Sequence, residues 1–403
     1  MSTQNLNQIK ESNRYQPRLS NKVNQVNGDK YDKGKVKYVI ISFTPTPYRD
    51  KVYDLVANEL GVSFKVYYCG TKEPIRDWKL KKLNHEHVFL KGWSITQKEE
   101  WRFIYFNPEV WKYLLKDRPE VVITKGFNPT QLFGWLYCLI FRKAHIPFTD
   151  TWEHSDSILT IVHKVVRKLV FSTSKAFIGP GKRTSELYQM YGVDTSKFFQ
   201  SHLAANTEIF SVYKPLHERP YDLMFAGQIQ DRKSPLFFVE VANRLRRAFP
   251  ALKILIIGNG PQKKEMIENL NEANIDYHYP GFIQPEELPD YYSASKIFLF
   301  PTKLDAWGVV ANEALASGTP VIISPFAGAA NDLVIDGENG YVLDLVLDQW
   351  VDKISHLLNR PELWKKMSLR GLETKQIFSY QNAAAGIIKA CKYLKDKSRN
   401  IGL

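Results

Sequence analysis

Short apolar runs and amphipathic stretches alternate along this chain in two separate series. In the first series, strands are expected at residues 37–43, 63–68, 121–124, 147–151 and 176–179, and helices at 50–59, 108–116 and 130–142. A polar break from 206 to 220 precedes the second series, which begins at 222–225. Strands that alternate with helices predict a doubly wound parallel sheet. At 403 residues and 44% apolar content, the chain is long enough for two such α/β domains.

Within the second series, residues 296–324 predict a strand, a turn, a helix and another strand in close succession. Residues 296–300 are a short apolar run, and residues 309–317 read as a helix that Gly318 ends. The residues that open this helix are Ala306, Trp307, Gly308 and Val309. Ligands of open α/β sheets bind beyond the carboxyl ends of the strands, and free N–H groups at a helix start attract phosphate. We therefore expect this turn to cradle a diphosphate.

Two carboxylates, Asp305 and Glu313, lie eight positions apart around the same helix start. Val309 and Glu313 share one helix face, which places Glu313 one turn beyond the expected phosphate site, where it could accept hydrogen bonds from ribose hydroxyls. The alternative is that Asp305 caps the helix and Glu313 is an ordinary helical acid.

The whole segment resembles the E-x7-E signature of family 4 glycosyltransferases, which are retaining enzymes of the GT-B fold. Asp305 stands where the family has its first Glu. The resemblance runs from about residue 225 to 343 and includes, in family order, Phe225-Ala226-Gly227, residues 254–261, Gly281-Phe282-Ile283, Leu288, Tyr291, and residues 332–334 and 336–340. Such an ordered series is far more specific than a lone Gly-x-Gly.

This resemblance implies two doubly wound Rossmann-like domains that face each other across a cleft. Residues 1–35 are polar and are expected to form a disordered tail. Residues 36–205 would form the acceptor-side domain, and residues 206–378 the nucleotide-sugar donor domain. Residues 379–403 would form a helix that crosses back onto the first domain.

The resemblance also implies a reaction, the retaining transfer of a sugar from a UDP- or GDP-linked donor to a glycan or lipid-linked acceptor in cell-envelope or exopolysaccharide synthesis. No cofactor and no metal are expected, because Lys233 and a helix start can do the electrostatic work of a divalent ion. One alternative is a sugar-nucleotide epimerase-like enzyme on the same fold, which would need other motifs. Another is a basic membrane-binding or nucleic-acid-binding protein, and salt-dependent binding to duplex DNA would favour the latter.

In the family, a Gly-Arg…Lys pattern after the first strand of the donor domain binds the diphosphate. The matching turn runs from Gly227 to Lys233, with Gln228 at the family Arg position and Lys233 at the family Lys position. Arg232 either compensates for Gln228 or is a solvated loop residue. The resemblance implies donor-binding roles for Gln228, Arg232, Ile283, Ala306, Trp307, Gly308, Val309 and Glu313, and catalytic roles for Lys233, Asp305 and His154.

On the acceptor side, the candidates are Thr46, Arg49 and Glu153. Arg49 lies in the loop after the opening strand and could meet an anionic acceptor or a donor phosphate, or be a surface residue at a helix start. His154 follows the strand expected at 147–151, where many relatives carry a His that contacts the donor sugar. Glu153 could occupy that place instead, and a lone His is more often structural.

Positive charge is concentrated in the first half of the chain. Residues 1–210 hold 32 basic and 20 acidic side chains, a balance of +12, whereas residues 211–403 hold 23 and 22, a balance of +1. The basic, apolar stretch 161–171 predicts an interfacial helix that docks on anionic lipid, and the alternative is a solvated helix face packed on its own sheet. The longest apolar run, 132–141, is about half a bilayer span. We therefore expect a cytoplasmic protein, peripheral on the inner face of the membrane. Residues 251–350, around the expected ligand site, hold 5 basic and 14 acidic side chains, which argues against nucleic-acid binding.

Overall fold

The computed structural model describes residues 36–400 except 73–77, 79–81, 97–102 and 211, and the polar tail expected at 1–35 lies outside this part. The first sheet is parallel, with strand order β3-β2-β1-β6-β7-β8-β9. Its strands are β1 (Tyr38–Ser42), β2 (Phe64–Tyr68), β3 (His87–Phe89), β6 (Val121–Lys125), β7 (Ala144–Phe148), β8 (Phe177–Gly179) and β9 (Phe198–Gln200). Its helices are α1 (Asp50–Leu60), α2 (Val110–Asp117), α3 (Pro129–Ile140), α4 (Glu153–Ser157), α5 (Ile161–Thr173) and α6 (Lys182–Met190). A separate antiparallel hairpin joins β4 (Trp93–Thr96) to β5 (Phe103–Phe106).

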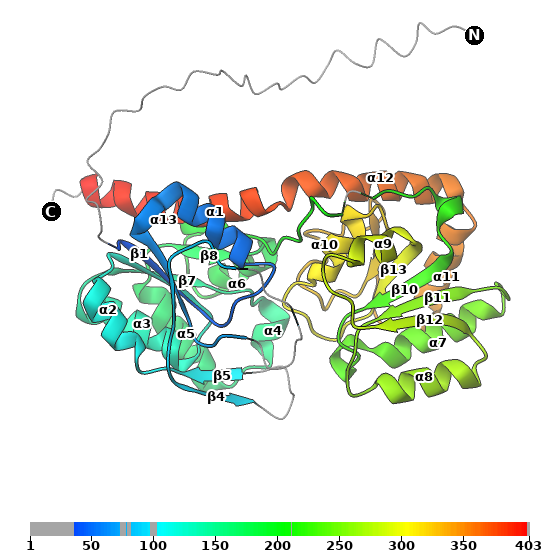
Figure 1. Cartoon of the computed structure of the whole chain (residues 1–403), viewed down its shortest axis with the longest axis horizontal. Helices are drawn as coiled ribbons and strands as arrows, with labels where there is room; N and C mark the ends of the chain where they lie inside the picture. Colours follow the sequence, from blue (N-terminus) through cyan, green and yellow to red (C-terminus); the bar gives the residue numbers. More distant parts are fainter. Residues whose placement is uncertain (1–35, 73–77, 79–81, 97–102, 211, 401–403) are drawn as a thin grey trace, which may run out of the picture. The chain divides into compact units, whose positions relative to one another are not determined.

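The second sheet is also parallel, with strand order β12-β11-β10-β13-β14-β15. Its strands are β10 (Tyr221–Ala226), β11 (Lys253–Ile257), β12 (Asp276–Gly281), β13 (Ser295–Phe300), β14 (Val321–Ile323) and β15 (Gly340–Val342). Its helices are α7 (Pro235–Arg246), α8 (Lys263–Glu272), α9 (Leu288–Ser293), α10 (Val309–Ala316), α11 (Leu347–Leu358) and α12 (Pro361–Ile377). Each sheet carries helices on both faces, as doubly wound folds require (Figure 1). The expected fold class, α/β with two Rossmann-like domains, is confirmed.

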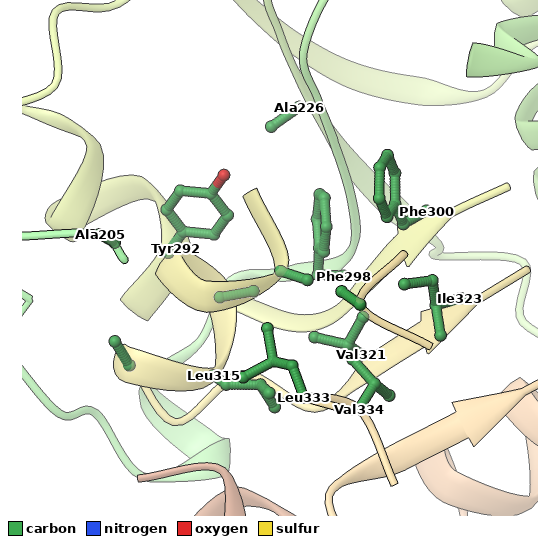
Figure 2. Close-up of a cluster of buried hydrophobic side chains, with 14 of the residues drawn as sticks. Ala205, Ala226, Tyr292, Phe298, Phe300, Leu315, Val321, Ile323, Leu333 and Val334 are labelled. Carbon is green, nitrogen blue, oxygen red and sulfur yellow. The ribbon is translucent and has the colours of Figure 1, made fainter. Parts of the chain in front are cut away.

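Buried apolar side chains explain why these segments form strands. All five residues of β1 are buried, because helices cover both faces of the sheet. In the second domain, one core cluster joins the ends of β10 and β13 to α9 and α10, and Figure 2 shows Tyr292, Phe298 and Phe300 within it. This packing holds the carboxyl ends of the strands close to the start of α10.

The last helix, α13 (Tyr380–Asn400), packs on elements of the first domain although it follows the second. Its apolar face contributes Ala383, Ala384 and Ile387 to the core that also contains Val52 and Val56 of α1. Figure 1 shows α13 beside α1. A Cβ on Gly386 would lie 1.8 Å from the backbone oxygen of Gln200, so only glycine allows this close approach to β9.

The fourth strand expected from sequence is displaced. We expected residues 147–151, whereas β7 spans Ala144–Phe148. His145 conceals the strand because it is polar, yet it is buried and its ring pairs with the hydroxyls of Thr124 at 2.9 Å and Ser174 at 2.8 Å. Burial lowers the pKa of His145 to about 3, so the ring is neutral inside the sheet. Short strands β3, β4, β5 and β9 were also not expected.

The strand orders place the two topological switch points, where ligands of open α/β sheets bind. The order in which successive strands are added to the sheet reverses between β1 and β6 in the first sheet, and between β10 and β13 in the second sheet. The loops that follow these four strands therefore meet in pairs at the carboxyl edges of the sheets.

Candidate functional site

Asp305 and Lys233 lie together at the switch point of the second sheet. Lys233 follows β10 at the end of a short 3-10 turn (Asp231–Lys233), and Asp305 lies in the loop after β13. The Lys233 ammonium and the Arg232 guanidinium both pair with Asp305 Oδ2, the latter at 3.3 Å. Burial alone would raise the pKa of Asp305, but these two cations outweigh it and lower the pKa to about 2. Asp305 is therefore ionised and shared by the two cations.

Arg232 belongs to this cluster and is not a solvated loop residue. Its side chain is 17% exposed, and its guanidinium also donates to Gln228 Oε1 at 3.1 Å and to the backbone oxygen of Leu304 at 3.2 Å. Gln228 occupies the family Arg position and contacts the Arg232 guanidinium. Arg232 could therefore supply the positive charge that Gln228 lacks.

The turn before α10 depends on glycine. Gly308 has a φ of +102°, and a Cβ at this position would lie 2.3 Å from the ring of Phe300. The same ring lies 4.4 Å from the Lys233 ammonium, so the turn and the cation share one support. The Trp307 N–H donates to Asp305 Oδ1 at 3.0 Å, while the Trp307 indole is buried and donates to Asn312. Trp307 can therefore contribute backbone, but not its ring, to a ligand site.

Glu313 lies on α10, and its side chain is held by two tyrosines. Its Oε2 accepts from the Tyr292 hydroxyl at 2.8 Å, and its Oε1 accepts from the Tyr48 hydroxyl at 3.3 Å. The residue is 1% exposed, and burial together with the Glu313 charge raises the pKa of Tyr292 well above its usual value. Arg219, also buried, donates to the backbone oxygens of Tyr292 and Ser295 and thereby anchors α9 beneath this contact.

The remaining donor-side candidates surround this group. Val309 and Ile283 are both partly buried against the core of the second domain, and Ile283 follows β12. Ala306 lies between Asp305 and Trp307, with its backbone oxygen close to Gly328. The structure therefore brings the candidate donor residues of β10, β13 and α10 to one edge of the second sheet.

Arg49, an acceptor-side candidate, is buried at the switch point of the first sheet and is not a surface residue. Its guanidinium donates to Asp150 Oδ1 at 3.2 Å and to the backbone oxygens of Ser201 and His202 at 3.4 and 3.2 Å. Thr46 lies in the same loop, where its backbone oxygen accepts from the N–H groups of Arg49 and Asp50.

His154 and Glu153 do not follow a strand end directly, because β7 ends at Phe148 and both residues begin α4. The His154 ring packs 5.4 Å from the ring of Trp152 and 5.0 Å from that of Phe326, between centroids. Trp152 donates from its indole nitrogen to the backbone oxygen of Asp305 at 3.2 Å. His154 is thus close to the Asp305 loop, whereas Glu153 is exposed.

Sequence reasoning missed Tyr48, Tyr292, Lys125 and Asp150 as site residues. Tyr48 and Tyr292 reach Glu313 from positions 265 and 21 residues away in the chain, so no local pattern marks them. Lys125 and Asp150 carry a detectable signal, since each lies at or just after the carboxyl end of a strand of the first sheet.

In the part of the chain that the structure describes, no three His, Cys, Asp or Glu side chains gather closely enough to hold a metal ion. Metal independence and the lack of a cofactor stay predictions. No helix among the described residues is both long and apolar enough to cross a membrane.

Residues 207–374 match the family model of glycosyl transferases group 1. This match contains Lys233, Asp305 and Glu313. The chain is 24% identical over 235 residues to a D-inositol 3-phosphate glycosyltransferase of Paenarthrobacter aurescens, covering 54% of this chain and 57% of that protein. It is 22% identical over 268 residues to a glycogen synthase of Mycobacterium tuberculosis, covering 65% and 58%. The alignments thus span little more than half the length of these relatives.

Solved structures share the whole architecture. A HepE protein of Anabaena, solved in complex with UDP, superposes with a TM-score of 0.72 at 11% identity, covering 89% of this chain and all of that one. Sucrose-phosphate synthase of Thermosynechococcus elongatus gives a TM-score of 0.65 at 16% identity, covering 89% and 99%. The chain has the GT-B fold, and its second domain is similar to those of glycosyltransferases.

Proposed function

We propose that this protein is a retaining, metal-independent glycosyltransferase that moves a sugar from a nucleotide-sugar donor to a glycan or lipid-linked acceptor of the cell envelope or an exopolysaccharide. The observation that carries this proposal is the group of Lys233, Arg232 and Asp305 at the second switch point, beside Glu313, inside the segment that matches glycosyl transferases group 1. The HepE structures contain UDP and UDP-glucose, and a uridine diphosphate donor is our first choice here as well.

The two cations of the cluster, Lys233 and Arg232, suit the chemistry. A departing nucleoside diphosphate gains negative charge in the transition state, and preorganised cations stabilise that charge. The Asp305 carboxylate pairs with both cations. When a diphosphate enters, it can take over Lys233 and Arg232 and leave the Asp305 carboxylate to accept hydrogen bonds from hydroxyls of the transferred sugar.

The donor site can be tested by nucleotide binding. We expect UDP or another nucleoside diphosphate to stabilise the protein thermally, and Lys233→Ala and Glu313→Ala each to weaken nucleotide binding or turnover at least tenfold, about 1.4 kcal/mol. Lys303→Gln is the matched control for the lysine, because Lys303 lies nearby but its side chain is 53% exposed and pairs with Asp231. Wild-type affinity and turnover in either alanine variant would exclude that residue from the site.

We further propose that α5 docks the first domain on an anionic membrane surface. Ile161, Val162, Val165 and Leu169 are 80%, 70%, 52% and 53% exposed, and Lys168 is exposed beside them. The neighbouring α3, which is joined to α5 by a hydrogen bond from Trp135 to Thr173, exposes Leu136, Leu139 and Ile140. Apolar side chains mixed with lysines fit the interface of an anionic bilayer.

Arg167 does not belong to this docking surface. It is buried, pairs with Asp156 and lies 4.8 Å from the centroid of the Phe127 ring, so its replacement would damage the fold. The test therefore uses Lys164→Gln with Lys168→Gln, where each lysine near the surface contributes on the order of 1 kcal/mol. We expect this double variant no longer to co-sediment with anionic vesicles at low salt. The exposed pair Lys365 and Lys366 of α12, changed in the same way, is the control. Wild-type protein that ignored anionic vesicles would favour a soluble acceptor.

A further inference from the structure

A second group of buried charges lies at the carboxyl edge of the first sheet. Lys125, the last residue of β6, donates to Asp150 Oδ2 at 3.1 Å, and Arg49 donates to Asp150 Oδ1 at 3.2 Å. Both cations also lie over the ring of Phe148, at 5.2 Å for the Lys125 ammonium and 4.6 Å for the Arg49 guanidinium. Three strand ends, those of β1, β6 and β7, bring these side chains together.

The arrangement repeats that of the donor cluster. In each domain, a lysine and an arginine share one aspartate, and the lysine lies over a phenylalanine that ends a strand, Phe148 in one case and Phe300 in the other. Each cluster also occupies the switch point of its sheet, because Arg49 follows β1 and Lys125 ends β6, just as Lys233 follows β10 and Asp305 follows β13. The switch point is the ligand-binding edge of such sheets.

The charges of this second group do not balance. Among the residues that the structure describes, Arg49 and Lys125 form ion pairs with Asp150 and with no other carboxylate. Burial would raise the pKa of Asp150, but the two cations lower it. A buried charge without a counter-charge is costly, so two cations over one carboxylate favour the entry of another anion. The Asp50 carboxyl next along the chain offsets this charge only in part at neutral pH, because burial raises its pKa to about 7.

A structural role, in which the side chains hold backbone segments in place, explains only part of the contacts of Arg49 and Lys125. The Arg49 guanidinium holds the segment at Ser201 and His202, which links the two domains, yet its Nε is buried and has no hydrogen-bond partner among the described residues. Lys125 holds no backbone group and donates only to Asp150 within the same part of the chain, although an ammonium has three N–H groups. Donors therefore remain for a ligand.

We propose that Arg49 and Lys125 form a second anion site, which binds a phosphate group carried by the acceptor. The inference rests on the proposed function, since an acceptor is meaningful only for a transferase. Arginine and lysine together provide the fork and the point charge that phosphate oxygens favour. The donor diphosphate has its own pair of cations in Lys233 and Arg232, which leaves this pair for the other substrate.

The experiment is a titration of the whole protein with inorganic phosphate, in the presence of saturating UDP that fills the donor site. Binding is measured by isothermal titration calorimetry. We expect wild-type protein to bind phosphate under these conditions. Lys125→Gln, whose amide can still donate to Asp150, should weaken phosphate binding at least tenfold while the thermal shift from UDP persists. Lys233→Gln should do the reverse, losing the UDP shift while still binding phosphate. Lys112→Gln, at a side chain that is 68% exposed, should change neither.

The pH profile supplies a second readout. Burial and the neighbouring Arg49 lower the pKa of Lys125 to about 8, so phosphate affinity should fall as pH rises through this value. Lys125→Arg should lessen the fall because arginine stays charged, and the fall that remains should come from ionisation of Asp50, whose pKa is about 7. Phosphate binding that survives in Lys125→Gln, or that disappears from wild-type protein once UDP is present, would overturn the proposal. If UDP failed to bind at all, the proposed donor site would be wrong, while phosphate binding that depends on Lys125 would still support the second site.

Discussion

Replacement of Asp305 by Asn tests whether the donor cluster exchanges its carboxylate for a diphosphate. Asparagine keeps the shape of the side chain and the acceptor for the Trp307 N–H, but it removes the charge that faces Lys233 and Arg232. The side chain is 15% exposed, so solvent screens the ion pairs only slightly.

The size of the effect follows from the pKa of Asp305, which falls from 3.8 to about 2 because Lys233 and Arg232 outweigh the cost of burial. A shift of this size corresponds to about 2 to 3 kcal/mol of folding free energy. Because the folded pKa is depressed, this stability is present above pH 3.8 and is lost as pH falls through 2. At neutral pH, Asp305→Asn should therefore lower the free energy of unfolding by about 2 to 3 kcal/mol.

Nucleotide should restore much of this loss. In wild-type protein, the diphosphate must displace Asp305 from Lys233, whereas in the variant both cations have lost this competing carboxylate. UDP should thus stabilise Asp305→Asn more than it stabilises wild-type protein, while sugar transfer falls because the carboxylate for the sugar hydroxyls is lost. Denaturant unfolding with and without UDP measures both effects, and Asp231→Asn, which removes a 75% exposed carboxylate nearby, is the control. Equal UDP stabilisation of variant and wild type, or equal losses of transfer and affinity, would show that Asp305 is only a structural cap.

Two further changes probe the supports of the sites. Burial raises the pKa of Asp50 from 3.8 to about 7 despite the hydrogen bond from Tyr68, so this group stabilises the fold below pH 4 and loses that contribution as pH rises to 7. Asp50→Asn should remove this pH dependence and should be more stable than wild-type protein at pH 8, by at most about 4 kcal/mol. Unfolding curves recorded across pH measure this difference. If the two proteins were equally stable at pH 8, the pKa of Asp50 would not be raised. Gly308→Ala should cost on the order of 1 to 3 kcal/mol and weaken UDP binding, because a Cβ there meets the Phe300 ring under Lys233. Gly337→Ala has a similar positive φ but open space around it, and an equal loss of UDP binding in both variants would refute the argument.

The strands with continuous apolar sequence were predictable, and the polar ones were not. β1, β2, β6, β8, β10 and β13 lie within one or two residues of the expected ranges, because both faces of each strand are covered and the central residues of each strand are mostly apolar. β7 was displaced because His145 satisfies its ring nitrogens inside the fold, with hydroxyls from Thr124 and Ser174 that are distant in sequence. Periodicity cannot show whether a buried polar side chain will find such partners.

Sequence periodicity also cannot predict a buried chain of hydrogen bonds in the first domain, which no sequence motif marks. Asp54, His85, Tyr68 and Asp50 form a chain of contacts of 2.7, 3.1 and 2.7 Å, assembled from α1, β2 and the segment before β3. Three hydrogens shared along this chain can satisfy all three contacts in two ways. In the first arrangement, Asp50 is protonated and His85 is neutral. In the second, Asp50 is ionised and His85 is positively charged. Burial raises the pKa of Asp50 and lowers that of His85, and both shifts favour the first arrangement.

The two charged clusters show what a sequence needs before it reveals a site. Lys233 was found because the resemblance covers the second domain, whereas Lys125 lies in the first domain, where no family motif was recognised. The strand order alone would have been sufficient to find the site of Lys125. Once β1 and β6 are known to be neighbours, the residues that follow or end them must meet at one edge, and a lysine and an arginine that meet beside a single aspartate predict an anion site. Topology therefore carries the information that local sequence lacks in this half of the protein.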